Sequence, residues 1–197
     1  MILPVLAYGD SVLRKKCTDI DSGFPNLTEL IANMWETMNH ASGIGLAAPQ
    51  VGHPIRLFVV DSDVILKKLE AAEDDEENDF AGEVGVKQVF INAKIHSRAG
   101  EEWYYNEGCL SIPNIREDVL RPDSIDIEYL DENFKPHREI FSGLTGRVIQ
   151  HEYDHIEGIL FTDLLKPLKK RLLKNRLEKI SRGDVKVDYK MRFPSRK

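Results

Sequence analysis

The stretch Ile149-Gln150-His151-Glu152-Tyr153-Asp154-His155 decides the fold and the chemistry expected of this chain, because it carries a His-Glu-x-x-His motif within a predicted helix. Residues four apart lie on one face of an α-helix, so His151 and His155 can bind one metal ion. Glu152 is offset by one residue, close enough to address a water on that ion without being a ligand. A metal with one position left for water lowers the pKa of that water from about 15.7 towards 7. The motif therefore predicts metal-assisted hydrolysis of an acyl bond.

The simpler interpretation of this motif is a helix with two histidines beside a solvated glutamate. Chance matches to so short a pattern occur in roughly a few per cent of chains of this length, so a metal site needs further ligands. Cys109, in Glu107-Gly108-Cys109-Leu110-Ser111, is the candidate third ligand, because thiolate binds zinc-type metals well. A lone cysteine is also often a small buried apolar residue. Gly108 and Ser111 favour the ligand, because they allow a tight backbone close to an ion.

The composition is that of an ordinary globular protein. The chain has 197 residues, of which 42% are hydrophobic and 30% charged, and 27 basic against 33 acidic residues give a formal charge of −6. This length suffices for one sizeable core, so we expect a single catalytic domain over residues 1–197. Two cysteines cannot form a disulfide framework, residues 1–6 do not resemble a signal peptide, and no apolar run is long enough to span a bilayer. We therefore expect a cytoplasmic protein that binds neither membrane nor DNA.

The hydrophobic patterns predict helices and antiparallel strands that are segregated rather than alternating. Helices are predicted for residues 26–41, where Asn26 and Glu29 have the spacing of a capping box, and for 142–158 and 164–180. Short strands are predicted for residues 55–60, 86–95, 125–130, 137–141 and 185–189. This segregation indicates an α+β fold, with antiparallel sheets packed around a central metal-binding helix, an N-terminal helix and a C-terminal amphipathic helix.

Two segments depart from these patterns. Residues from about 63 to 85 concentrate acidic side chains with almost nothing apolar to bury, and we interpret them as an acidic, partly disordered surface insertion. A calcium-binding loop is the alternative, but the spacing of the acids does not fit an EF-hand. Residues from about 183 to 197 form a C-terminal tail that contains Tyr, Lys and Arg.

A third motif, Gly43-Ile44-Gly45-Leu46-Ala47-Ala48-Pro49-Gln50, follows the first predicted helix. Its small residues let a backbone approach a ligand closely, and Gln50 offers an amide donor beside it. Together with Glu-Gly-Cys-Leu-Ser at 107–111 and Gln-His-Glu-Tyr-Asp-His at 150–155, it resembles the three signature motifs of the peptide deformylases. The resemblance covers residues 1 to about 180, and the order and separations of the motifs also match.

The resemblance implies a function and a metal centre. Family members remove the N-terminal formyl group from formyl-methionine of newly made proteins, releasing formate, and their substrates are thus formyl-methionyl nascent peptides. They work best with Fe²⁺, although Zn²⁺ and Ni²⁺ also bind. The family's metal ligands match Cys109, His151 and His155, and its catalytic carboxylate matches Glu152.

The resemblance also implies how the substrate binds. Gln50 and the backbone N–H of Leu110 match the two donors to the oxyanion that forms when the formyl carbon is attacked. The expected substrate-binding residues are Gly43, Ile44, Gly45, Leu144 and Val148. Leu144 and Val148 lie on the helical stripe of His151, so we expect them beneath the metal, in an apolar pocket for the first side chain. Arg147 departs from the family pattern, because many members have an aliphatic residue there, near the methionine pocket.

The predicted helix 164–180 has two unlike faces. Its buried face is expected to consist of Leu165, Leu168, Leu172, Leu173, Leu177 and Ile180. The other face carries Lys166, Lys169, Lys170, Arg171, Lys174 and Arg176. A solvated amphipathic helix, whose Lys and Arg stems cover the core, accounts for these cations without a partner. The alternative, which the resemblance suggests, is docking on the ribosome through the phosphates of its RNA.

Two other functions would account for part of the pattern. A zinc peptidase usually takes its third ligand from downstream of the motif, but the candidates there, Glu157 and Asp163, lie too close in sequence. A non-catalytic ribosome-binding protein with a structural metal would need a fourth protein ligand, for which only Cys17 is left. Release of formate from a formyl-methionyl peptide distinguishes the three functions.

Overall fold

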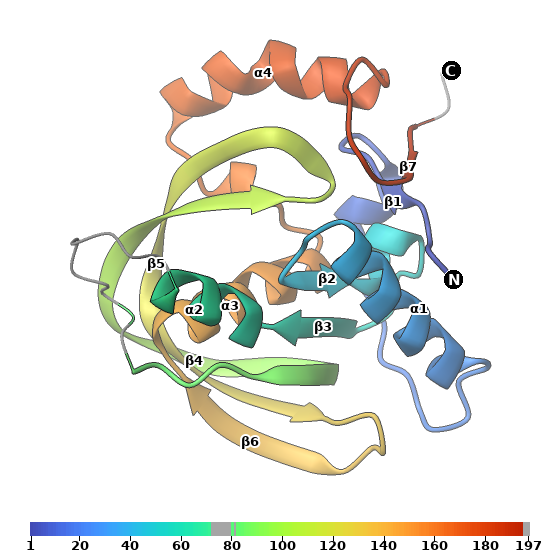
Figure 1. Ribbon diagram of the computed structural model, residues 1–197, viewed down its shortest axis with the longest axis vertical. Coiled ribbons are helices and arrows are strands. Elements are labelled where there is room, and N and C mark those ends of the chain that lie inside the picture. The colour runs from blue at the N-terminus through green and yellow to red at the C-terminus, as the bar shows by residue number, and fades with distance from the viewer. Residues whose placement is uncertain (72–79, 81, 195–197) are drawn as a thin grey trace.

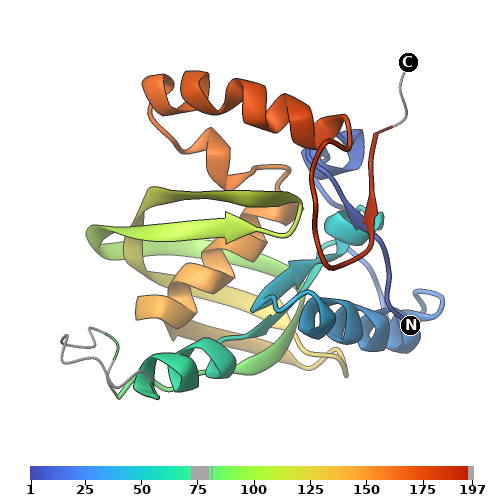
Figure 2. The same ribbon diagram turned by 45° about the horizontal axis from the view of Figure 1, so that its top comes forward.

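Helix α3 (Gly143–Ile156), which carries the His-Glu-x-x-His motif, lies at the centre of the molecule (Figures 1 and 2). The computed structural model describes residues 1–71, 80 and 82–194. Every residue of α3 except Gly143 and Tyr153 is buried. A helix that is buried on all sides lies in a protein interior, so its polar side chains need partners there.

Five antiparallel strands form one sheet that curls around α3, in the order β2-β3-β4-β5-β6 (Figure 2). Their bounds are β2 (Gly45–Ala47), β3 (Leu57–Asp61), β4 (Lys87–Cys109), β5 (Ile112–Leu130) and β6 (Pro136–Phe141). Strands β4 and β5 form a long hairpin that ends in a two-residue turn, Leu110–Ser111. Its register shifts at several points, for example between Ala99 and Glu102, and such bulges bend a hairpin so that it can wrap around a helix. The predicted α+β fold around a central motif helix is confirmed.

The remaining elements cover the ends of this sheet. They are β1 (Val5–Leu6), η1 (Ser11–Arg14), α1 (Leu27–His40), η2 (Ala48–Val51), α2 (Asp63–Glu70), η3 (Phe161–Asp163), α4 (Pro167–Ser181) and β7 (Met191–Arg192). Helix α4 lies across the β4–β5 hairpin, and the chain then turns back so that β7 pairs in parallel with β1 (Figure 2). None of the helices in the described residues combines the length and the apolar character needed to cross a membrane.

Three apolar clusters hold these layers together. Phe58 and Phe90, both fully buried, stack at 4.7 Å between their ring centroids in the cluster that also contains Val148 of α3. Met34 of α1 belongs to a second cluster on the other face of β3, and Leu173 of α4 belongs to a third. The motif helix is thus fixed from the sheet side by aromatic packing.

The three predicted helices are confirmed, with ends within three residues of the predicted ones. The predicted capping box does not form, because Asn26 has a φ of +57° and makes no side-chain cap. The strands predicted at 86–95 and 125–130 cover only the first part of β4 and the last part of β5. Between residues 94 and 106 no residue is buried, so that part of β4 lacks the apolar alternation from which a strand is recognised.

The acidic segment and the tail differ from expectation in part. The segment 63–85 begins as helix α2, whose Leu66 is buried, and residues 72–79 and 81 lie outside the described residues. The strand predicted at 185–189 is wrong, since the paired residues are Met191 and Arg192. The partner strand decides this position, because Val5 and Ala7 donate their N–H groups to the carbonyls of Lys190 and Arg192.

The predicted buried face of α4 is also wrong in two places. Leu173, Leu177 and Ile180 are buried, but Leu168 and Leu172 are 61% and 66% exposed. Only one side of α4 packs against the protein. Consecutive residues of an α-helix are rotated by about 100° around its axis, so Leu172 and its neighbour Leu173 lie on different faces. Leu164, just before the helix, is exposed as well.

Candidate metal centre and substrate cleft

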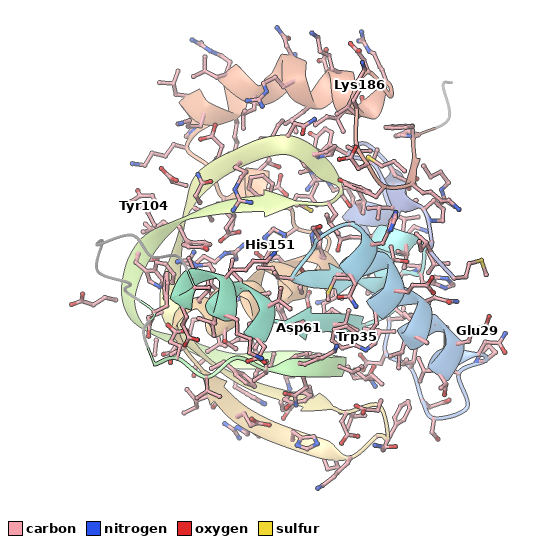
Figure 3. The ribbon with its side chains drawn as sticks, viewed as in Figure 1. Glu29, Trp35, Asp61, Tyr104, His151 and Lys186 are labelled. Atoms are coloured by element: carbon pink, nitrogen blue, oxygen red, sulfur yellow. The ribbon has the colours of Figure 1, made fainter. Side chains whose placement is uncertain are left out.

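The three predicted metal ligands meet in the interior of the molecule. His151 and His155 project from successive turns of α3, and Cys109 ends β4 just before the hairpin turn. Their ligand atoms all lie within 4.8 Å of one another, and the Cys109 Sγ is 3.3 Å from the His155 Nε2. His151 lies in the middle of the molecule (Figure 3). The fold therefore brings Cys109 close to two histidines that follow it by 42 and 46 positions in the sequence, and the three can form one coordination shell.

The surroundings of His151 fit a metal centre. Its Nδ1 lies 2.9 Å from the Oε2 of Glu107, so this nitrogen is occupied and Nε2 is left for an ion. A carboxylate behind a ligating imidazole holds the ring in one orientation and makes it a better ligand. One thiolate and two imidazoles suit Zn²⁺ and similar divalent metals, and three protein ligands leave a position open for water or substrate.

Glu107 is the centre of a buried ionic network. Arg121 donates to both of its oxygens, at 2.7 and 3.0 Å, and also binds Asp154 at 2.6 Å. Burial by itself would raise the pKa of Glu107, but the hydrogen bonds with His151 and Arg121 outweigh it and lower the pKa well below its usual range. Glu107 is therefore a permanent anion behind the metal centre.

Arg147 belongs to the same network. This explains why an arginine stands where the resemblance led us to expect an aliphatic residue. It is 2% exposed, donates to Glu107 at 3.2 Å and to the carbonyl of Trp103 at 2.7 Å, and stacks on the Trp103 ring at 4.1 Å. Since both its charge and its guanidinium face have partners, it lines the cleft without presenting an uncompensated cation.

Glu152 lies beside the three ligands but has a different environment. It is buried, and its Oε2 has no hydrogen-bond partner among the residues that the structure describes. Burial raises the pKa of Glu152 to about 7, although nearby His151 partly opposes the effect. A Cβ atom at Gly45 would collide with this carboxylate, so the glycine of β2 makes room for it. A buried carboxylate with a pKa near neutrality can both accept and release a proton.

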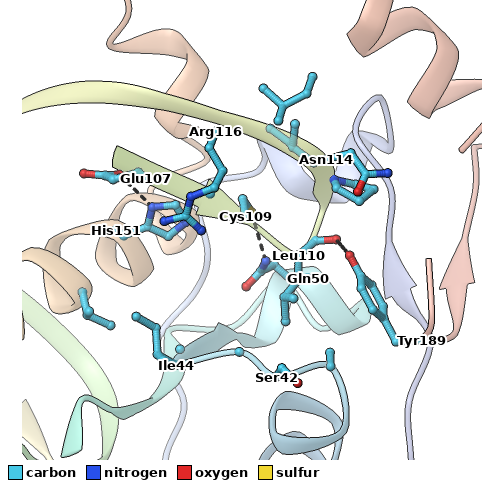
Figure 4. A pocket seen from close by; sticks show the side chains of 18 of the residues that line it. Ser42, Ile44, Gln50, Glu107, Cys109, Leu110, Asn114, Arg116, His151 and Tyr189 are labelled. Carbon is cyan, nitrogen blue, oxygen red and sulfur yellow. Dashed lines mark hydrogen bonds and ion pairs between the residues drawn. The ribbon is translucent and has the colours of Figure 1, made fainter. Parts of the chain in front are cut away.

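Gln50 points its amide nitrogen at the metal centre. Its Oε1 accepts a hydrogen bond from the N–H of Ala47 at 2.8 Å, which fixes the orientation of the amide. Its Nε2 then donates towards Cys109 Sγ at 3.4 Å (Figure 4). The same nitrogen donates towards Ser111 Oγ at 3.2 Å. Leu110 lies in the adjacent hairpin turn, so both predicted oxyanion donors lie beside the thiolate ligand.

A cavity of about 700 Å³ opens onto this centre and contains most of the predicted substrate residues. Gly43, Ile44, Gly45 and Val148 line it, together with Gln50, Cys109, Leu110, His151 and Glu152. Leu144 is fully buried and lies outside this lining, and its N–H donates to the Glu83 carboxylate at 3.0 Å. His155 is likewise behind the cavity wall, 1% exposed.

The sequence did not identify two parts of this site. Glu107 could have been found, because residues two apart in a strand point to the same face, and Glu107 precedes Cys109 by two. The C-terminal segment Lys186–Tyr189 also lines the cavity, and the Tyr189 hydroxyl donates to the carbonyl of Leu110 at 2.8 Å (Figure 4). Nothing in the tail sequence signals this contact, because it depends on how α4 turns the chain back.

Comparison with known proteins agrees with this geometry. The sequence profile of one family, polypeptide deformylase, matches residues 2–171. Among curated relatives, the peptide deformylase of Christiangramia forsetii is 57% identical over all of this chain and 98% of its own length. The peptide deformylase of Flavobacterium psychrophilum is 52% identical over the full length of both chains.

Solved structures show the same likeness. A peptide deformylase from Legionella pneumophila superposes with a TM-score of 0.75 at 34% identity, covering 93% of this chain and 98% of that one. Peptide deformylase 1B of Arabidopsis thaliana, in complex with an inhibitor, superposes with a TM-score of 0.76 at 33% identity, covering 92% of each chain. These likenesses extend over nearly the whole chain, and the Cys-His-His cluster lies on its central helix and hairpin.

Proposed function

The chain belongs to the polypeptide deformylase family and is a metal-dependent peptide deformylase, and we propose how its own residues carry out the reaction. The reaction removes the formyl group from the N-terminal formyl-methionine of newly synthesised polypeptides and releases formate. The single observation that carries this assignment on the structural side is the Cys109, His151 and His155 cluster at the base of a peptide-sized cleft.

Cys109, His151 and His155 would hold one divalent metal. When bound, such a metal acts as a Lewis acid and makes a water nucleophilic at neutral pH. We propose Fe²⁺ as the ion in the cell, with Zn²⁺ or Ni²⁺ able to replace it, because one thiolate and two imidazoles accept all three. The role of Glu107 is to hold His151 by its Nδ1, and Arg121 keeps Glu107 in place.

Glu152 is the proposed proton carrier. Its unpartnered Oε2 lies beside the ligands, where it can take a proton from the attacking water and deliver it to the leaving amine of methionine. Gln50 Nε2 and the Leu110 N–H are the proposed donors to the formyl oxygen as it becomes negative. The Gln50 amide is already oriented by Ala47, so little reorganisation is needed when that charge develops.

The peptide is proposed to lie along β2 and the loop before it. Gly43, Ile44 and Gly45 line the cavity, and β2 is an edge strand of the sheet, so its outer edge can pair with an extended peptide. Ile44 and Val148 would form the apolar walls of the first side-chain pocket, and Leu144 would support Val148 from one turn earlier in α3. Residues 1–197 would then act as one catalytic domain, in the cytoplasm.

Formate release from formyl-Met-Ala-Ser is the direct test, with the metal removed by a chelator as control. We expect turnover that disappears with the metal and returns when Fe²⁺ or Ni²⁺ is restored. Cleavage of the Met-Ala bond instead would support a zinc peptidase, and a metal-loaded protein without turnover would support a structural metal. Comparing formyl-Met with formyl-Asp peptides tests the pocket, because equal rates would contradict its apolar character.

Docking on the ribosome through α4 is a further proposal, and two features of the helix support it. Its cations are unevenly engaged: Lys169 binds Glu117 at 2.7 Å and Arg176 donates to the Asn114 carbonyl, both on β5. The exposed leucines Leu164, Leu168 and Leu172 add apolar surface on or just before this helix. A surface with both properties fits a mixed RNA and protein partner better than plain solvent.

Charge reversal tests this docking. Lys169, Lys170 and Arg171, changed together to Glu, should weaken salt-sensitive co-sedimentation with ribosomes while formyl-peptide turnover stays unchanged. The matched control reverses three exposed lysines elsewhere, Lys15, Lys94 and Lys135. Equal co-sedimentation of both variants and the unaltered protein would mean that α4 is ordinary solvated surface.

A further inference from the structure

The C-terminal segment Lys186–Tyr189 lines the same cavity as the metal centre, although it is far from the catalytic motifs in sequence. It follows α4 and precedes β7, where the chain turns back along the hairpin turn Leu110–Ser111 (Figure 2). Its alternating exposure resembles that of a strand, with Val187 and Tyr189 half-buried and Lys186 and Asp188 exposed. One edge of the segment therefore faces the protein and the other faces solvent at the rim of the cleft.

Three contacts fix the position of this segment. The Asn114 side chain donates to the Lys186 carbonyl at 3.2 Å, at its start. The Tyr189 hydroxyl donates to the Leu110 carbonyl at 2.8 Å, at its end (Figure 4). Immediately afterwards, the Lys190 carbonyl accepts the N–H of Val5 at 2.9 Å, where β7 joins β1. A segment held at both ends is a pre-formed wall, so a ligand need not order it on binding.

The cleft leads from the metal centre to this wall. At the end of the cleft where the metal centre lies, Gly45 is next to the Glu152 carboxylate. In the other direction along the chain, Ser42 and Ala41 line the same cavity as Lys186–Tyr189. An extended peptide advances by about 3.3 Å per residue. A peptide with its formyl group at the metal centre and its backbone along Gly45–Gly43 is thus directed towards Ser42 and the C-terminal segment.

The exposed lining of the cavity as a whole carries more positive than negative charge. In the described part of the chain, the exposed charged residues that line the cavity are three cations, Lys68, Arg116 and Lys186, and one acid, Asp188. The other lining acids, Glu107 and Glu152, are buried, and Glu107 is paired with Arg121. The field of such a lining favours a negative side chain on a ligand that extends along it.

We propose that Lys186–Tyr189 is a subsite of the substrate cleft, which binds the residues that follow the formylated methionine and favours acidic side chains among them. This inference rests on the proposed deformylase function. Tyr189 anchors the wall to the turn that carries Leu110, and Lys186 presents its charge to the third residue of the peptide. The tail thereby determines which nascent chains are processed fastest.

A matched pair of charge reversals tests the subsite. Deformylation of formyl-Met-Ala-Asp-amide and formyl-Met-Ala-Lys-amide is measured for the unaltered enzyme, Lys186→Glu and Lys190→Glu. Lys190 directly follows the segment and is exposed, but it does not line the cavity. We expect Lys186→Glu to lower the Asp-to-Lys ratio of kcat/KM by about fivefold, mainly through KM, and high salt to reduce the difference. Lys190→Glu should change the ratio by less than about 1.5-fold.

The outcomes separate this inference from the function on which it rests. An unchanged ratio in Lys186→Glu, or equal changes in both variants, would overturn the subsite, because net charge alone would then explain the data. Formyl-Met-amide, which lacks the third residue that the subsite would bind, reports on the deformylase activity itself. If the unaltered enzyme releases formate from it while the ratio does not respond to Lys186→Glu, only the subsite fails. If the unaltered enzyme releases no formate from formyl-Met-amide with the metal restored, the deformylase function itself is contradicted.

Discussion

Helices α3 and α4 have nearly equal lengths, but the helix with fewer Leu and Ile residues is the buried one. Twelve of the 14 residues in α3 are buried, although most of them are polar, charged or small. Only three of the 15 residues in α4 are buried, although the helix contains five Leu and Ile residues. The number of apolar residues therefore does not decide which helix lies inside. What decides it is whether each polar side chain finds a partner.

In α3 each buried polar side chain except Glu152, the proposed proton carrier, has at least one partner among the described residues. Thr145 bonds Ser62 at 2.9 Å between hydroxyls, and Gln150 donates to the Pro122 carbonyl at 3.0 Å. Asp154 is paired with Arg121. Helix α4 meets the protein along one side only, so its remaining leucines and cations stay outside. The contrast predicts large effects for single changes around α3 and small ones for changes on the outer side of α4.

Cys109→Ala should have the largest effect, because it removes one of three ligands from a site that α3 alone cannot complete. We expect the purified protein to lose its metal and its deformylase activity. Metal content by mass spectrometry and formate release are the measurements. Cys17→Ala is the matched control, since Cys17 is the other cysteine and lies outside the ligand cluster. Stoichiometric metal in Cys109→Ala would show that another side chain completes the site.

Glu152→Gln should separate chemistry from metal binding. The amide keeps the shape of the side chain but cannot carry the proton, so we expect turnover to fall by about two to four orders of magnitude with the metal retained. Glu157→Gln is the control, because Glu157 lies just after α3 and is paired with Arg56 rather than with the metal centre. Near-normal turnover of a fully loaded Glu152→Gln enzyme would remove Glu152 from the mechanism.

Arg121→Met tests whether the ionic network keeps α3 inside. It would leave Glu107 and Asp154 buried with their main partner gone, so we expect a loss of about 3–5 kcal/mol in the free energy of unfolding. Urea denaturation of both proteins gives this difference. Arg138→Met breaks an exposed pair with Asp126 and should leave the denaturation midpoint nearly unchanged. Similar midpoints for Arg121→Met and the unaltered protein would mean that packing alone holds α3.

The sequence predicted most of the chemistry of the site but less of its framework. His151, Glu152 and His155 are close in sequence, so helical periodicity alone relates them, and the Cys109 and Gln50 motifs were recognisable by their resemblance to a family. The network in which Arg121 joins Glu107 to Asp154 and Glu107 holds His151 was not predicted, because its contacts join residues 14 to 44 positions apart around the curled hairpin. Such contacts depend on bulges in β4 and β5, which leave no clear periodic signal.

The helix faces show the same limit. Periodicity located α4 well, but it could not tell Leu172 from Leu173, because a six-residue apolar set covers too wide an arc to lie on one interface. Only the position of β5 and η3 beneath the helix decides which leucines are covered. The tail is similar: its alternation was visible, but the strand that pairs with β1 begins two residues after the predicted one ends.

The neighbours Leu172 and Leu173 give the smallest and most closely matched test of the comparison. Leu173 is 3% exposed and belongs to the cluster beneath α4, so Leu173→Ala should cost about 2–5 kcal/mol in the free energy of unfolding. Leu172 is 66% exposed, so Leu172→Ala should change it by less than about 0.5 kcal/mol. Both variants make the same chemical change with the same helix propensity, and urea denaturation measures both. Equal losses would mean that Leu172 is covered in solution, by a second copy or by a change in α4, and the contrast between the two helices would then weaken.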